Sequence, residues 1–155
     1  MAFGIDLGTT NSCVARIDDT GRAVIVKSAL GEDKTPSAVY FESPRHAVVG
    51  RTARNAALVA PEHVAQQVKR DMGKDTKYTF HGQEHTPEMV SALILKELAR
   101  GAEENSGQVV RDVVITVPAT FGSVVWLRGF KFHLVAMLMS PGDRKGRPRP
   151  LLALR

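Results

Sequence analysis

The chain has very little cysteine and lacks any long apolar run. Its single cysteine, Cys13, excludes an internal disulfide framework in a chain of 155 residues, so a reducing compartment is the natural setting. No apolar run reaches the ~18 residues that a membrane-spanning helix requires. The N-terminus also lacks the charged region and apolar stretch of a signal peptide. We therefore expect a cytoplasmic protein with no membrane contact, in which Cys13 is an inert core thiol.

Acidic residues are nearly absent from the C-terminal part of the chain. Residues 123–155 hold seven Lys and Arg against Asp143 alone, a net +6, so the other 122 residues carry 14 basic and 15 acidic side chains, a net −1. A nucleic-acid partner would have to bind this tail. We expect none, because few aromatic residues lie among its arginines. The tail is too rich in Pro, Gly and Arg for a packed core. We predict that it is disordered or that it was translated from a shifted reading frame.

The N-terminal stretch, residues 3–15, predicts a strand, a tight polar turn and a second strand. Apolar and polar residues alternate from Phe3 to Leu7, and apolar character resumes at Val14. A concave run of backbone N–H groups in such a turn attracts phosphate oxygens. The candidate phosphate-binding residues are those of the turn: Gly8, Thr9, Thr10 and Asn11.

Asp6 carries the only charge in this stretch and lies at the exit of the first strand. A carboxylate beside phosphates usually faces a hydrated magnesium ion, which makes Asp6 a candidate metal residue acting through water. The alternative is an ordinary hairpin with a buried, hydrogen-bonded aspartate. The turn is not a Walker-type loop, because no G-x-x-x-x-G-K-[ST] string exists and it joins two strands.

The rest of the first 122 residues alternates strand and helix patterns. The first three strands are predicted to form an antiparallel meander. Further strands are expected at residues 38–41, 47–49 and 111–117, and helices at 51–58, 62–72 and from Pro87 to near Gly107, with Thr86 as the cap. The run 124–139 fits either a short strand or a helix.

Residues 81–85 fit the H-x-x-E-H string of a class of zinc peptidases. That chemistry requires both histidines on one helical face. Gly82 follows a strand with an alternating pattern, and the next predicted helix begins at Pro87 with Thr86 as its cap. We therefore expect a small hairpin around Gly82 and Gln83 and no zinc site.

Four segments together resemble the 70-kilodalton heat-shock chaperones, the DnaK-like family. They are residues 5–12, 31–37, 68–73 and 114–121, and they occur in the family's order with compatible spacing. Sugar kinases share the Asp-Leu-Gly-Thr core of the first segment, but they do not share the last two. Thr120 departs from the aromatic residue usual at its position.

The resemblance implies an α/β, actin-like ATPase (ribonuclease H-like) fold. Residues 1–122 would form a partial first lobe with a mixed sheet and flanking helices. It also implies ATP or ADP with Mg²⁺ as cofactors, and ATP-driven binding and release of unfolded polypeptides with a J-domain co-chaperone and a nucleotide exchange factor. Lys69 would be catalytic, pointing at the γ-phosphate, and Pro118 would belong to the interlobe switch.

The resemblance stops after Gly122. The family's arginine partner of the switch proline would fall at Trp126, and Arg128 is out of register. The second phosphate loop and the distal carboxylates have no counterpart, so whether the chain is an enzyme is uncertain. We expect this fragment to be inactive. The alternatives are a sugar-kinase-like phosphotransferase fragment and a non-enzymatic interaction protein that acts through its basic tail.

Overall fold

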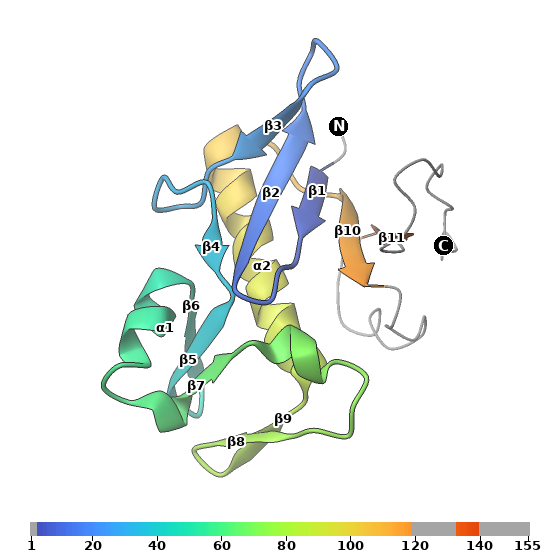
Figure 1. The fold of residues 1–155 in the computed structure, drawn as a ribbon. Coiled ribbons are helices and arrows are strands. Elements are labelled where there is room, and N and C mark those ends of the chain that lie inside the picture. The colour runs from blue at the N-terminus through green and yellow to red at the C-terminus, as the bar shows by residue number, and fades with distance from the viewer. Residues whose placement is uncertain (1–2, 119–132, 140–155) are drawn as a thin grey trace.

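The larger sheet of the protein is mixed and lies against one long helix (Figure 1). A computed structural model describes residues 3–118 and 133–139. The sheet has the strand order β11-β10-β1-β2-β3, with β4 paired to β2. The strands are β1 (Phe3–Asp6), β2 (Asn11–Ile17), β3 (Ala23–Val26), β4 (Thr35–Pro36), β10 (Asp112–Pro118) and β11 (His133–Met139).

Strand directions confirm the predicted meander. β1 pairs antiparallel with β2, and β2 pairs antiparallel with β3, whereas β10 runs parallel to both β1 and β11. Within the C-terminal segment, β11 is one of the two structures that the sequence allowed for residues 124–139. The predictions for Thr120, Trp126 and Arg128, and for residues 140–155, lie outside the described residues.

A smaller sheet follows in the chain. It has the order β6-β5-β7, and helix α1 (Arg51–Ala56) contacts it. Its strands are β5 (Ala38–Ser43), β6 (His46–Val49) and β7 (Val64–Gln66).

The helix predicted over residues 62–72 is wrong. The segment instead forms the short 3-10 helix η1 (Pro61–His63), strand β7 and a second 3-10 helix, η2 (Val68–Asp71). β7 pairs with β5, with Ala38 opposite Gln66, so tertiary pairing overrides local helix propensity. Gln67 then adopts a left-handed conformation, φ 55°, which interrupts any helical path.

The segment with the zinc-peptidase string is a hairpin, as expected. β8 (Tyr78–Phe80) pairs antiparallel with β9 (Gln83–His85). The turn is at His81 and Gly82, one residue earlier than predicted, and both residues have positive φ, 50° and 76°. Two successive positive φ values are typical of the primed turns that join twisted strands.

Helix α2 (Pro87–Ser106) forms the other layer of the core. The Thr86 hydroxyl accepts a hydrogen bond from the Met89 N–H at 3.3 Å, and Gly107 ends the helix at φ 66°, confirming both predicted ends. Its buried face packs into one apolar cluster with the sheet; the helix supplies Val90, Ile94, Leu95, Leu98, Ala99 and Ala102. No helix in the described part of the chain is long and apolar enough to cross a membrane.

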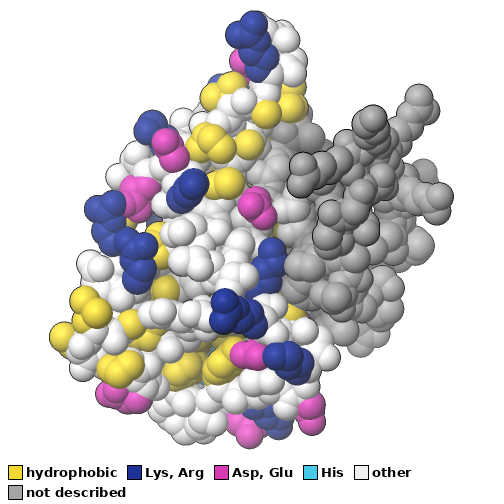
Figure 2. Space-filling model, in the orientation of Figure 1, with side chains coloured by type: hydrophobic (Ala, Val, Ile, Leu, Met, Phe, Trp, Pro, Cys, Tyr) yellow, Lys and Arg dark blue, Asp and Glu magenta, His cyan; other side chains and the backbone are white. Residues whose placement is uncertain are grey.

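The outer strand β3 leaves apolar side chains in solvent. Val24 and Ile25 of β3 are 40% and 45% exposed, and Ile17 at the end of β2 is 48% exposed. Apolar side chains gather over this end of the molecule (Figure 2). Because β3 is the last strand on its side of the sheet, its outer backbone groups have no ladder partner among the described strands. An apolar sheet edge of this kind favours self-association.

Candidate phosphate-binding site

The turn between β1 and β2 is closed tightly, because only glycine fits its first polar position. A Cβ added to Gly8 would lie 1.9 Å from the Asn11 carbonyl oxygen. Leu7, just before it, is 2% exposed and anchors the turn in the core. Thr10 and Asn11 are exposed at its other side. The turn is therefore rigidly attached at one end and open to solvent at the other.

The backbone N–H groups of the turn are not equivalent. The Gly8 N–H donates to the Ser12 hydroxyl at 3.2 Å, and Ser12 is buried. Within the described part of the chain, the N–H groups of Thr9 and Thr10 have no hydrogen-bond acceptor. Thr9 and Thr10, each with an N–H and a hydroxyl, are thus the donors that the turn can offer to an anion.

Asp6 is exposed at the end of β1, so the alternative of a buried aspartate is excluded. One carboxylate oxygen accepts a hydrogen bond from the Thr116 hydroxyl of β10 at 2.9 Å. Thr116 lies opposite Asp6 in the parallel pairing of the two strands. The carboxylate is therefore held in place and still open to the water shell of a cation. Sequence reasoning missed Thr116, because nothing in the local pattern shows which strand pairs with β1.

β1 and β10 both end at the same edge of the sheet, where ligands of open α/β sheets commonly bind. Pro118 is the last residue of β10, two positions beyond Thr116. The structure thus brings together the turn, Asp6 and the strand that ends in the predicted switch proline.

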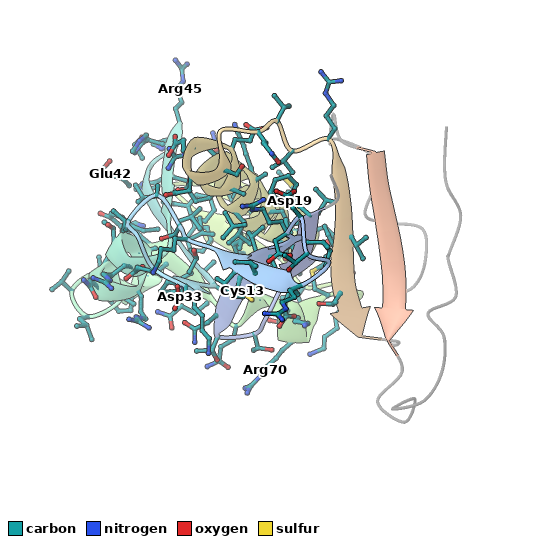
Figure 3. All side chains as sticks on the ribbon, turned by 90° about the horizontal axis from the view of Figure 1, so that it is seen from above. Cys13, Asp19, Asp33, Glu42, Arg45 and Arg70 are labelled. Atoms are coloured by element: carbon teal, nitrogen blue, oxygen red, sulfur yellow. The ribbon has the colours of Figure 1, made fainter. Side chains whose placement is uncertain are left out.

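Lys69 lies on η2, which is drawn below the β1–β2 turn in Figure 1. The preceding residue, Val68, is buried in the same apolar cluster as Leu7. Lys69 is half-buried and has no ion-pair partner among the described residues. Its neighbour Arg70 points away from the molecule in Figure 3. Lys69 therefore lies on an element that packs into the same apolar cluster as the residue before the turn, and it has no ion pair in the described part of the chain.

The end of η2 is fixed by a carboxylate. Asp71 accepts hydrogen bonds from the Tyr78 hydroxyl at 2.7 Å and from the Lys74 ammonium at 3.0 Å. The Tyr78 bond is the main cause that lowers the pKa of Asp71, with the Lys74 bond second. Burial, followed by the hydrogen bond to Asp71, raises the pKa of Tyr78 above its ordinary range. These contacts hold the C-terminal end of η2 in place.

Cys13 lies in β2 opposite Asp6. Burial raises the pKa of its thiol, the nearby Asp6 carboxylate raises it further, and Lys34 lowers it. Lys34 comes just before Thr35, the first residue of β4, which pairs with Ser12 of β2. The thiol is therefore neutral near pH 7, in keeping with the inert role expected for it.

This arrangement predicts opposite effects of two substitutions on the reactivity of Cys13. Asp6→Asn removes a charge that raises the thiol pKa, so at a given pH more thiolate forms and alkylation by iodoacetamide is faster. Lys34→Gln removes a charge that lowers the pKa, so alkylation is slower. The measurement is the alkylation rate between pH 7 and 9. Asp19→Asn, beyond the far end of β2, is the control and leaves the rate unchanged; shifts of the same sign for both variants would contradict the geometry.

An open groove in the described part of the chain lies elsewhere. It has a volume of about 660 Å³ and is lined by residues of β7, η2 and β8, including Gln66, Arg70 and Tyr78. Neither Asp6 nor the turn lines it. No group of three or more metal-binding side chains occurs in the described residues. A magnesium ion at Asp6 would therefore need ligands from water and phosphate, which suits an ion that keeps several waters.

Comparison with known protein families identifies the family of this chain. The chain matches the family model described as Hsp70 protein over residues 2–78 and 75–124. The matched part includes the turn, Lys69 and Pro118, and it ends near the Gly122 boundary seen in the sequence. It confirms the predicted actin-like ATPase fold, of which the mixed sheet and flanking helices form a part. The chain belongs to the Hsp70 family of chaperones.

Proposed function

We propose that these residues supply one side of a Mg²⁺–ATP site. The single observation that carries the proposal is the fixed, exposed Asp6 carboxylate beside the free N–H groups of Thr9 and Thr10. Asp6 would hold the hydrated metal, and the turn would hold phosphate oxygens. Gly8 contributes by its missing Cβ, since its N–H is already bonded to Ser12.

The bound nucleotide supplies a γ-phosphoryl group whose negative charge spreads over its oxygens during transfer. Lys69 would offset that charge as a positioned cation. Thr9 and Thr10 would orient the phosphates through their N–H groups and hydroxyls. Asp6, held by Thr116, would fix the water shell of the metal.

The chaperone role that we propose is the one implied by the family: ATP-driven binding and release of unfolded polypeptides in the cytoplasm. A J-domain co-chaperone and a nucleotide exchange factor would be the partners, and Pro118 would relay nucleotide state to the rest of the chaperone. Phosphoryl transfer depends on positioning from both sides of the nucleotide. We therefore propose that residues 1–155 alone bind Mg²⁺–ATP weakly and do not turn it over.

Calorimetric titration and a turnover assay on the 155-residue chain test this proposal. We expect a Kd of about 1 mM for Mg²⁺–ATP and turnover at least about 100-fold below that of an intact Hsp70. Asp6→Asn should weaken Mg²⁺–ATP binding about tenfold, to the level of metal-free ATP. Turnover comparable with an intact Hsp70 and abolished by Lys69→Ala would refute the claim of inactivity. No detectable binding at 10 mM ATP, on the order of ten times the expected Kd, would refute the site itself.

A further inference from the structure

Two buried serines connect the phosphate-binding turn to a distant part of the chain. The hydroxyls of Ser12 and Ser37 are hydrogen-bonded to each other at 2.8 Å, and the two residues are 1% and 5% exposed. Ser12 follows the turn in β2, whereas Ser37 lies between β4 and β5. Polar side chains this deeply buried usually require such pairing.

Through this pair, Ser37 holds both ends of the turn. The Ser12 hydroxyl that it contacts accepts the Gly8 N–H at 3.2 Å, at the start of the turn. The Ser37 N–H also donates directly to the Thr10 carbonyl at 2.9 Å, near the end of the turn. The pairing of Asn11 with Pro36 and of Ser12 with Thr35 keeps the segments in register.

We propose that Ser37 is a positioning residue for the phosphate-binding turn. It fixes the Thr10 carbonyl and, through Ser12, the Gly8 N–H, so that the free N–H groups between them keep one direction toward the anion. Pre-organised donors bind an anion more tightly than donors that must be ordered on binding. Ser37 itself would not touch the nucleotide. This inference rests on the proposed function of the turn.

The test compares Ser37→Ala with Ser91→Ala in the full chain. Ser91 is the matched control because it is also buried, at 1% exposure, and its hydroxyl donates to Met72 Sδ, at 3.4 Å, and to no residue of the turn. We expect Ser37→Ala to raise the Kd for Mg²⁺–ATP about three- to tenfold, as loss of one hydrogen bond would. Ser91→Ala should leave the Kd unchanged, although both variants lower the unfolding midpoint to a similar degree.

Two further readouts keep the outcomes separate. In Ser12→Ala the shared bond is already lost, so adding Ser37→Ala should raise the Kd less than it does in the wild type. Amide hydrogen exchange without nucleotide should be faster at Gly8, whose N–H is bonded to Ser12, in Ser37→Ala alone. An unchanged Kd in Ser37→Ala, or an equal rise in Ser91→Ala, would overturn the inference. If the wild type binds no Mg²⁺–ATP, the proposed function fails, and unchanged exchange in Ser37→Ala would then overturn the positioning role as well.

Discussion

Gly8→Ala is expected to destabilise the protein and to remove nucleotide binding together. The added Cβ would lie 1.9 Å from the Asn11 carbonyl oxygen, a backbone atom that can move only if the turn opens. Forcing an extra methyl group into a packed site typically costs about 1–3 kcal/mol. Opening the turn would also displace the N–H groups of Thr9 and Thr10. Urea unfolding and Mg²⁺–ATP titration of the same sample measure the two effects.

Gly4→Ala is the matched control for this experiment. Gly4 lies in β1, the strand before the turn, and its added Cβ would meet only the Ala15 carbonyl oxygen, at 4.0 Å. Alanine replaces glycine in a strand with little cost or a small gain. We therefore expect Gly4→Ala to keep both stability and binding. If the two variants had the same stability and the same affinity for Mg²⁺–ATP, the tight closure of the turn would matter for neither.

Leu7→Ala is expected to have the larger effect on stability. Leu7 is 2% exposed and belongs to the apolar cluster that also contains Val68 of η2. Truncation of a buried leucine costs about 2–5 kcal/mol, because the cavity adds to the lost burial. That is a large share of the about 5–15 kcal/mol that stabilises a typical domain. The measurement is the shift of the urea midpoint at constant m-value.

Leu58→Ala provides the same chemical change on the surface. Leu58 is 85% exposed, and such substitutions usually change stability by less than about 0.5 kcal/mol. Because Leu7 links the turn to the element that carries Lys69, Leu7→Ala should also reduce Mg²⁺–ATP binding at temperatures where the chain is still folded. If Leu7→Ala lowered the free energy of unfolding by less than about 1 kcal/mol, that result would contradict the packing described here.

Local patterns predicted much of this fold. The alternation in residues 3–7, the polar turn and the apolar residues of β2 define a hairpin that needs no distant partner. The capping threonine and the terminal glycine of α2 act within one helical turn of their positions, so sequence alone locates them. The site residues Asp6 and the turn lie on this locally determined unit.

Features that depend on distant partners could not be predicted. Residues 64–66 carry a helical pattern, yet they form β7 because β5 offers a ladder. Thr116 contacts Asp6 across 110 positions of the chain, and Ser37 contacts Ser12 across 25. A serine or threonine that will be buried against a partner looks the same in sequence as one on the surface. Thr116 and Ser37, which hold the site in place, could therefore be recognised only once the pairing of the strands was known.

The most direct test is a Mg²⁺–ATP titration of the ¹⁵N-labelled chain, observed amide by amide. The account predicts that the largest shifts occur at Thr9 and Thr10, with smaller shifts near Lys69. Gly82, in the β8–β9 hairpin turn, should stay unchanged. Shifts confined to the groove residues Gln66 and Arg70, with the turn unaffected, would contradict the assignment of the phosphate site.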